Sequence, residues 1–242
     1  AKRESIENIL EFCQLKKEGQ IKAVVVTGCL AERYREEIAS EIPEADVILG
    51  IGSNEKIVSA IKKAVAGEKV VLFGEKNELP LNGDRIISNL PFYAYLKLAD
   101  GCDNFCTYCA IPYIRGRYRS RKIEDVMKEA EHLAKHGVKE LVLVAQDTTR
   151  YGEDLYGKSV LPELLDRLQK LDGLKWIRML YCYPDKITDE LIAAINRNDK
   201  VLPYLDVPVQ HISTPILKAM NRRDTEETLR ALFAKLRREI PG

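Results

Sequence analysis

Hydrophobic positions in the first part of the chain follow a helical and then a strand-like spacing. Apolar residues recur every three or four positions over 1–18, which predicts an amphipathic helix that ends at Gly19. The apolar run 21–29 predicts a buried parallel strand, and a helix over about 31–41 and a second short strand at 46–50 follow. This alternation of strands and helices is typical of a small open parallel sheet.

The pattern continues with one more helix and then becomes irregular. Ser53 is expected to cap a helix whose apolar positions run from Ile57 to Val65 and which ends at Gly67. Prolines and an Asn-Gly pair then interrupt residues 67–91, which predicts an irregular connection that includes one short strand-like run, "KVVLFG".

From residue 92 onward, a strand-like run followed by an amphipathic helix occurs four times. The strand-like runs are "FYAYLKLA" (92–99), "KELVLVA" (139–145), "KWIRMLYC" (175–182) and "LPYLDVPV" (202–209). One helix is predicted after each strand. The first has an apolar face over 123–133 and the second an apolar face over 161–168. The third is expected to have Thr188 as its N-cap, and the short fourth to have Pro215 as its first residue. A last helix is expected to open with Asp224 and Glu227 as a capping box.

These patterns predict an α/β protein in two regions. Residues 1–75 are expected to form part of a small Rossmann-like parallel-sheet domain, 76–91 a linker, and 92–242 a partial (β/α) barrel with four strand–helix units. Unusual stretches follow each of the four strands, where barrel enzymes carry their chemistry. They are a cysteine-rich loop, "QDTTRYG" (146–152), "YPD" (183–185) and "QHIS" (210–213), and we expect them to face one cavity.

Composition adds a few exclusions. A chain of 242 residues with 45% hydrophobic residues can bury a full core, and its net charge of +1 argues against nucleic acid as the substrate. No apolar run is long enough to cross a membrane and no signal peptide is visible. Six cysteines, half of them in one tight cluster, indicate a metal site in a reducing compartment, so a cytoplasmic protein without a membrane partner is expected. The chain opens inside a helical pattern and stops where another strand would follow, which indicates a fragment lacking both ends.

Three of the six cysteines lie close together in sequence. Cys102, Cys106 and Cys109 have the spacing C-x3-C-x2-C, and no second pair follows to complete the four ligands of a structural zinc site. Iron–sulfur clusters are held by thiolates, and three ligands on a [4Fe–4S] cluster would leave one iron open to an exogenous ligand. The alternative is a set of unpaired thiols, or a zinc knuckle completed by a distant residue.

The cysteine loop and its surroundings resemble a known family. The C-x3-C-x2-C run, with Tyr108 before its last cysteine, is similar to that of the radical S-adenosylmethionine (SAM) enzymes. The longer string "DGCDNFCTYCAIPYIRGRYRSR" resembles the methylthiotransferases among them. "AQDTTRYG", "YPD" and "YLDVPVQHIS" resemble the branch that acts on a ribosomal protein (RimO type) more closely than the tRNA-modifying branch (MiaB type). The resemblance covers essentially the whole chain.

The resemblance implies a transferase, specifically a radical SAM methylthiotransferase. Cys102, Cys106 and Cys109 would hold a [4Fe–4S] cluster that binds SAM at its open iron and cleaves it. The product would be a methylthio group on the β-carbon of an aspartate in small-subunit ribosomal protein twelve. An electron donor such as flavodoxin or ferredoxin would be a further partner. The family's fold implies that the second region is a partial radical-SAM barrel.

Several polar residues are candidates to bind SAM or substrate. The candidates for SAM are Tyr108, Gln146, Asp147, Arg178, Gln210 and His211, and those for substrate are Arg115 and Arg117. Each has a simpler alternative. Gln146 and Asp147 could satisfy loop backbone, His211 could be an ordinary hydrogen-bonded residue, and Arg178 needs an acidic partner that is either SAM or Asp/Glu. The alternating arginines 115, 117, 119 and 121 could form a solvated basic face.

Cys29 lies in "VVTGCLAERY", at a strand-to-helix turn of the first region. By the same resemblance, it is the third of three ligands of a second [4Fe–4S] cluster, whose other two cysteines would lie before Ala1. One cluster is therefore expected here, against two in the full-length family. Cys13 and Cys182 are expected to be buried apolar residues, and His132 and His136 a surface pair.

Two rival functions stay open at this stage. The first is the same chemistry on a tRNA adenosine, and the second is a non-catalytic iron–sulfur or zinc module. The family also continues beyond this chain with further strand–helix units and a small β-barrel domain. Four strands alone would leave an unprotected edge strand.

Overall fold

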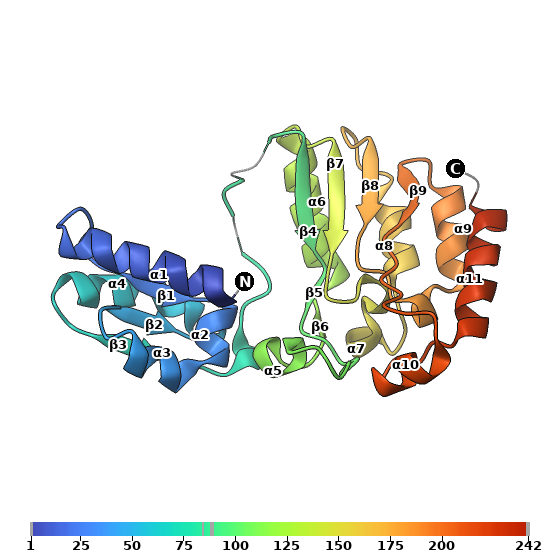
Figure 1. Cartoon of the computed structure of the whole chain (residues 1–242). Helices are drawn as coiled ribbons and strands as arrows, with labels where there is room; N and C mark the ends of the chain where they lie inside the picture. The colour runs from blue at the N-terminus through green and yellow to red at the C-terminus, as the bar shows by residue number, and fades with distance from the viewer. Residues whose placement is uncertain (1, 84, 88–89, 241–242) are drawn as a thin grey trace. The chain divides into compact units, whose positions relative to one another are not determined.

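The chain folds into two compact units (Figure 1). The structure, a computed structural model, describes residues 2–83, 85–87 and 90–240. One unit comprises Ala1–Pro80 together with Ala110–Gly116, and the other comprises Leu81–Cys109 together with Arg117–Gly242. The start of the helix predicted over 1–18 and parts of the predicted linker, at 84, 88 and 89, lie outside the described residues.

The first unit contains a three-stranded parallel sheet in the order β1-β2-β3. Its strands are β1 (Val25–Thr27), β2 (Val47–Leu49) and β3 (Val70–Leu72), and its helices are α1 (Lys2–Lys17), α2 (Cys29–Arg33), α3 (Arg35–Glu41), α4 (Ile57–Val65) and α5 (Ile111–Arg115), with 3₁₀ turns η1 (Ile51–Lys56) and η2 (Lys76–Glu78). The predicted run "KVVLFG" supplies β3. The first two strands and their parallel arrangement are as the sequence predicts, whereas the third belongs to a segment that the sequence assigned to an irregular connection.

Helices pack on both faces of this sheet because its strand residues alternate between them. Val26 packs with Cys13 of α1 and Ile38 of α3 in one apolar cluster. The opposite face carries Val47, which packs with Ala60 of α4 in a second cluster. Burial on both faces explains why these strands read as continuous apolar runs rather than as alternating ones.

Two local predictions in the first unit are wrong. The helix expected over 31–41 is divided into α2 and α3 at Tyr34, whose φ of −116° and ψ of 33° leave the helical region. Ser53 does not cap a helix. It is buried inside η1, and α4 begins only after Lys56.

The second unit contains a four-stranded parallel sheet in the order β4-β7-β8-β9. Its strands are β4 (Tyr93–Lys97), β7 (Glu140–Val144), β8 (Trp176–Met179) and β9 (Val201–Leu205), with a short antiparallel pair, β5 (Ala99–Asp100) and β6 (Arg119–Ser120). Its helices are α6 (Ile123–Lys135), α7 (Glu153–Tyr156), α8 (Leu161–Leu168), α9 (Asp189–Arg197), α10 (Thr214–Ala219) and α11 (Glu226–Glu239), with 3₁₀ turns η3 (Thr148–Arg150) and η4 (Pro184–Lys186). The four predicted strand–helix units are all present.

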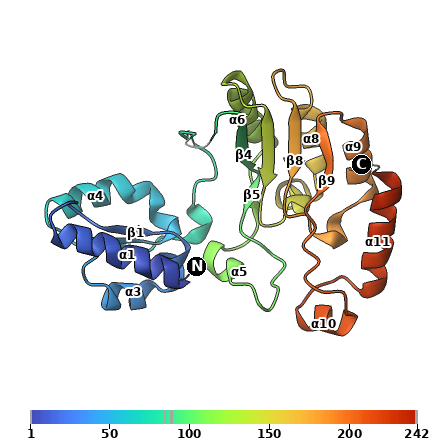
Figure 2. The same ribbon diagram turned by 45° about the horizontal axis from the view of Figure 1, so that its top comes forward.

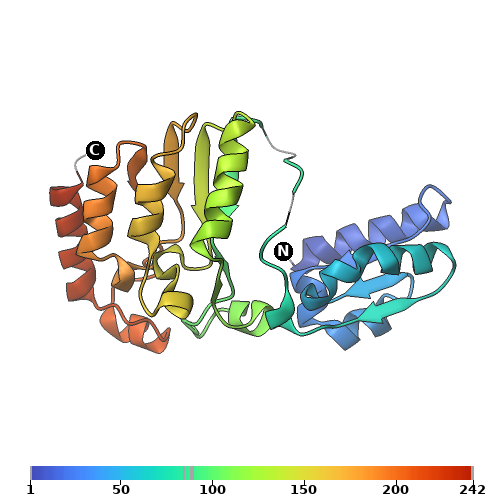
Figure 3. The same cartoon turned by 180° about the vertical axis from the view of Figure 1, so that it is seen from behind.

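One face of this sheet is covered by helices. Figure 3 shows α6, α8 and α9 lying over it. Leu96, Leu141 and Ile177 project from β4, β7 and β8 into the core that these helices close. On the opposite face, Tyr95 and Trp176 are about half exposed. The unit is therefore an open, one-sided layer of strands and helices, in agreement with a partial barrel.

The helix starts of the second unit test the capping predictions. Thr188 caps α9 as predicted, because its side chain accepts a hydrogen bond from the backbone N–H of Leu191. The capping box of α11 is formed by Thr225 and Thr228, not by Asp224 and Glu227. Asp224 is buried beside Arg222, and the helix begins after it.

The carboxyl ends of the four strands point to the same end of the sheet, where β5, β6 and α10 lie (Figures 1 and 2). All the unusual stretches of the second region follow these ends. Within the described part of the chain, no helix has both the length and the apolar character that crossing a bilayer requires.

Candidate functional site

The three clustered cysteines lie on an irregular loop that begins after β5. Cys102, Cys106 and Cys109 are half-buried, and all are free thiols. Two residues of the loop have a positive φ, Gly101 at 76° and Phe105 at 48°. A left-handed backbone turns the chain sharply, so the loop curls instead of continuing as a strand or a helix.

The thiols influence one another electrostatically. The pKa of the Cys102 thiol is raised to about 11, mainly by burial, with a contribution in the same direction from the charged forms of Asp147, Cys106 and Cys109. The backbone N–H of Asn104 lies 3.5 Å from the sulfur of Cys102 and favours the thiolate. Among the residues that the structure describes, no three His, Cys, Asp or Glu side chains converge on a position for a single metal ion.

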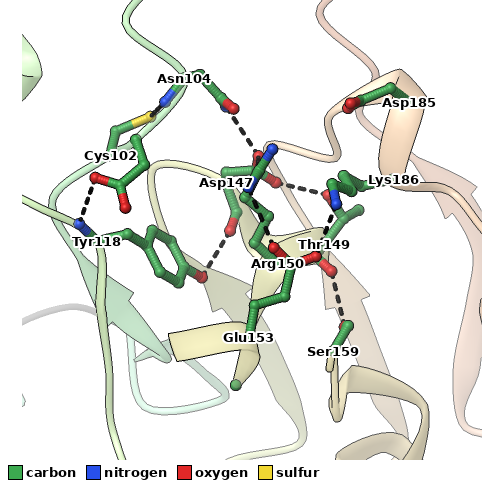
Figure 4. Close-up of polar contacts among 12 residues, drawn as sticks. Cys102, Asn104, Tyr118, Asp147, Thr149, Arg150, Glu153, Ser159, Asp185 and Lys186 are labelled. Carbon is green, nitrogen blue, oxygen red and sulfur yellow. Dashed lines mark hydrogen bonds and ion pairs between the residues drawn. The ribbon is translucent and has the colours of Figure 1, made fainter. Parts of the chain in front are cut away.

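Asp147 connects the cysteine loop to the end of β7 (Figure 4). Its carboxylate is fully buried and accepts hydrogen bonds from Asn104 Nδ2 at 2.9 Å, Thr149 Oγ1 at 2.6 Å and Arg150 Nε at 3.2 Å. The hydroxyl of Tyr118 donates to the backbone carbonyl of Asp147 at 2.8 Å. The carboxylate predicted to bind SAM is thus surrounded by protein donors.

The segment after α10 holds the other side of the loop. Asn221 Nδ2 donates to the carbonyl oxygen of Phe105 at 2.9 Å and to that of Asn104 at 3.3 Å. The backbone N–H of Thr107 donates to the carbonyl of Met220 at 3.1 Å. Asn221 itself has a φ of 57°, a conformation that asparagine tolerates better than most residues. The cysteine loop is therefore fixed from two sides.

A buried arginine beside the loop was missed by the sequence reasoning. The guanidinium carbon of Arg222 lies 4.1 Å from the ring centroid of Tyr183, and its Nη2 donates to the carbonyl of Pro208 at 2.9 Å. Nε is buried without a hydrogen-bond partner among the described atoms. Two tyrosines, Tyr108 and Tyr183, lie next to Cys106. Burial raises the pKa of both, and the positive charge of Arg222 partly offsets this rise. The only signal in the sequence was the position of Arg222 beyond the fourth strand.

The predicted polar residues at the other strand ends differ in their exposure and in their hydrogen-bond partners. Gln146 and Gln210 are exposed, and Gln210 has a φ of 65°. His211 accepts a hydrogen bond at Nδ1 from the backbone N–H of Ser213 at 2.9 Å, which leaves Nε2 as its donor nitrogen. Tyr108 is about half exposed.

Arg178 has its acidic partner within the protein. It lies on β8, where the parallel register pairs it with Val142 of β7. Its Nε donates a hydrogen bond to Oε1 of Glu140, also on β7, at 2.6 Å. Its guanidinium also lies over the ring of Tyr204, 5.2 Å from the centroid. The requirement for a carboxylate is satisfied by Glu140 without a ligand.

The four alternating arginines do not form one uniform face. Arg117 is exposed and lies 3.4 Å from Asp103 Oδ1. Arg121 is buried and bonds Glu129, Asn82 and the carbonyl of Lys97. Arg115 belongs to the first unit, where its Nη2 donates to the sulfur of Cys29 at 3.4 Å. Arg115, Arg117 and Arg121 therefore have three different surroundings.

Cys29 begins α2 and is half-buried. The residue before it, Gly28, has a φ of 100°, which brings the chain sharply from β1 into the helix. Cys13 and Cys182 are buried in the cores of the first and second unit, as predicted. His132 and His136 are an exposed pair with ring centroids 4.1 Å apart.

Comparison with family models gives two matches. A model of the radical SAM superfamily matches residues 96–242, and a model of an uncharacterized protein family, UPF0004, matches residues 1–50. The first match contains the cysteine loop and every strand of the larger sheet from Leu96 onward. The second contains Cys29.

Curated relatives match along the whole chain. A ribosomal protein uS12 methylthiotransferase RimO of Clostridium botulinum (strain Hall) is 51% identical over 243 residues, which is 100% of this chain and 55% of that protein. The protein with the same name from Clostridioides difficile (strain 630) is 51% identical over 243 residues, 100% of this chain and 54% of that one. The chain spans about half the length of the curated relatives it matches.

Solved structures agree with the fold. The radical S-adenosylmethionine methyltransferase TsrM from Kitasatospora setae matches with a TM-score of 0.64 and 14% identity, over 90% of this chain and 48% of that one. At this identity the likeness concerns the fold alone.

Proposed function

The chain belongs to the radical SAM superfamily, and from that premise we propose that it is part of a methylthiotransferase that acts on a ribosomal protein. The reaction would place a methylthio group on the β-carbon of an aspartate. One observation carries the proposal. A loop with three free, half-buried thiols lies at the carboxyl end of the parallel sheet, in a chain 51% identical over its whole length to relatives named for this activity.

The donor set supports a [4Fe–4S] cluster better than a zinc ion. Each thiolate of a cubane binds a different iron, so its ligands surround a volume and do not meet at one point. The three thiols are close enough to affect the pKa of Cys102, yet the described residues offer no group of three donors for one ion. A closed structural zinc site would need four converging ligands.

When bound, the cluster and SAM supply the one-electron chemistry, and the chain's residues hold and orient them. Cys102, Cys106 and Cys109 would hold the cluster, which requires the buried Cys102 to lose its proton. Gln146 and Gln210 are exposed at strand ends and would donate hydrogen bonds to SAM. The donor nitrogen Nε2 of His211 and the half-exposed Tyr108 could also contact SAM.

Two predicted SAM ligands already have partners within the protein and are not expected to bind SAM. Asp147 is fully buried with three donors, and Arg178 is paired with Glu140. For the substrate, Arg117 is the better candidate of the two arginines because it is exposed. Arg115 is engaged with Cys29 instead.

Cys29 would bind a second cluster in the complete protein, together with cysteines from outside this chain. The guanidinium of Arg115 beside its sulfur would favour the thiolate that such a cluster needs. Reconstitution of this chain alone should therefore give about four irons per chain, the content of one [4Fe–4S] cluster.

The remaining partners follow from the proposed reaction. An electron donor such as flavodoxin or ferredoxin would reduce the cluster, and the ribosomal substrate would place the protein in the cytoplasm. The same chemistry on tRNA is the alternative. The names of the relatives and the near-neutral charge of the chain both favour the ribosomal protein.

Anaerobic reconstitution with iron and sulfide tests the proposal. The chain is expected to bind about four irons and to cleave SAM when reduced. Cys106→Ala should lose the cluster, whereas Cys182→Ala, which removes a core thiol of the same unit, should retain it. Zinc in every preparation, or an unchanged iron content in Cys106→Ala, would refute the assignment. Methylthio transfer by the full-length protein, assayed on ribosomal protein and on tRNA, separates the two substrates.

A further inference from the structure

We propose that Asp147 is a positioning residue that anchors Asn104, whose backbone amide faces the sulfur of Cys102 and raises the reduction potential of the cluster. The inference rests on the proposed function, because it concerns the cluster that the three cysteines would hold. It gives Asp147 a different role from that of a SAM ligand.

Both carboxylate oxygens of Asp147 are already engaged. Oδ1 accepts from Thr149 Oγ1 at 2.6 Å, and Oδ2 accepts from Asn104 Nδ2 at 2.9 Å and Arg150 Nε at 3.2 Å. The residue is 0% exposed. A buried carboxylate is stable only when it is paired and hydrogen-bonded, so these bonds are the reason for its charge being tolerated there. A ligand would have to displace one of them.

The carboxylate is also held in place by its surroundings. Arg150 Nη1 donates to Glu153 Oε2 at 3.1 Å, and Glu153 Oε1 accepts from Lys186 Nζ at 2.9 Å (Figure 4). The network therefore joins the ends of β7 and β8. The hydroxyl of Tyr118 fixes the main chain of Asp147 from the side of β6. A carboxylate tied to three segments is a rigid anchor for the loop that it binds.

Asn104 transmits this position to the cluster site. Its side chain is held by Asp147, its carbonyl oxygen by Asn221 Nδ2 at 3.3 Å, and its backbone N–H points at Cys102 Sγ at 3.5 Å. Hydrogen bonds to cluster sulfurs tune reduction potentials. An N–H donor stabilises the added negative charge of the reduced state, so a well-oriented Asn104 amide makes the cluster easier to reduce. Without Asp147, the amide would lose its fixed orientation.

The test is an electron paramagnetic resonance titration of the reconstituted chain without SAM, combined with iron content and SAM binding. Asp147→Asn retains the shape but lacks the charge and one acceptor. Asn104→Ala retains the backbone amide but releases it from the anchor. Gln146→Ala is the matched control, because it alters the neighbouring exposed residue at the same strand end.

Asn104→Ala should shift the midpoint potential to more negative values. Asp147→Asn also removes a buried negative charge near Cys102, which by itself makes the cluster easier to reduce. Its shift should therefore be more positive in the Asn104→Ala background, where no anchor is left to lose, than in the wild-type background. Gln146→Ala should leave the potential unchanged and weaken SAM binding. An unchanged potential in Asn104→Ala would overturn the inference, and so would equal shifts by Asp147→Asn in the wild-type and the Asn104→Ala backgrounds. If Asp147→Asn lost its iron, Asn104→Ala alone would decide. A wild-type chain without a cluster would instead refute the proposed function.

Discussion

Arg121 is expected to stabilise the second unit rather than to bind a ligand. Its residue is 5% exposed. Nη1 donates to the carbonyl of Lys97 at 2.9 Å and to Glu129 Oε2 at 2.5 Å, and Nε donates to Asn82 Oδ1 at 2.7 Å. It thereby joins β4, α6 and the segment before β4. Arg121→Met keeps the length of the side chain and removes every one of these bonds.

The expected loss of stability follows from what the substitution leaves behind. Breaking a buried ion pair by removing one partner costs about 3–5 kcal/mol, because the other charge stays buried. Glu129 retains Arg85 at 2.9 Å, so the lower end of that range applies, about 3 kcal/mol. With a slope of about 2 kcal/mol per molar urea, the unfolding midpoint should fall by about 1.5 M.

Urea unfolding monitored by tryptophan fluorescence measures this change. Trp176 is the single tryptophan of the chain and lies on β8, so its signal reports on the second unit. Arg117→Met is the matched control. Its side chain is 69% exposed and its ion pair with Asp103 should contribute less than about 1 kcal/mol. Equal midpoints for Arg121→Met and Arg117→Met would refute the structural role of Arg121.

Three further predictions concern the second unit and the thiols. Arg197 donates two hydrogen bonds to Asp166 and lowers the pKa of that carboxyl, so the pair adds stability above roughly pH 4 that disappears as the pH falls through the lowered pKa. Asp166→Asn should therefore cost about 0.5–1 kcal/mol in urea unfolding at pH 7 and progressively less toward pH 3; an equal cost at both would contradict this. Both Asn221→Ala and Asn221→Gly remove the hydrogen bond to the carbonyl of Phe105, and alanine in addition disfavours the positive φ at this position by about 1 kcal/mol. A chelator should therefore remove iron faster from Asn221→Ala than from Asn221→Gly. A wild-type rate in Asn221→Ala would argue against a role of this hydrogen bond in holding the loop. Alkylation of the cluster-free chain, read by mass spectrometry, should spare the buried Cys13 and Cys182, since burial raises the pKa of Cys182 to about 12; early labelling of Cys182 would show that its core opens.

Elements with a long, regular apolar pattern were predicted well. The helices over 123–133 and 161–168 were found because burial of one face imposes the spacing of their apolar residues. Short-range polar signals were less reliable. Ser53 and Asp224 both looked like helix caps, yet both side chains are buried: Ser53 lies inside η1, and Asp224 is paired with Arg222. A polar residue before a helical pattern looks the same in sequence whether its side chain caps the helix or is buried in the folded protein.

The candidate site shows the same division. The spacing of the three cysteines identified the loop, because a cluster-binding segment is local in sequence. The partners that decide the roles of Asp147 and Arg178 are not local. Asn104 lies 43 residues before Asp147, and Glu140 lies 38 residues before Arg178. Sequence reasoning correctly required an acidic partner for Arg178, but only the side-chain hydrogen bond between the paired strands β7 and β8 identified Glu140.

Backbone strain supports the view that the loops at this end of the sheet are shaped by the protein itself. The non-glycine residues with positive φ in the described ranges are Phe105, Tyr181, Gln210 and Asn221, and all follow the carboxyl end of a strand or α10. Such conformations cost about 1–3 kcal/mol each and persist only where other contacts enforce them. Asn221 binds the carbonyl of Phe105, and Asp206 accepts from the N–H of Tyr181 at 3.0 Å. Because protein hydrogen bonds hold these turns, the cysteine loop owes its curvature to its neighbours, and a cluster would enter a loop already bent to receive it.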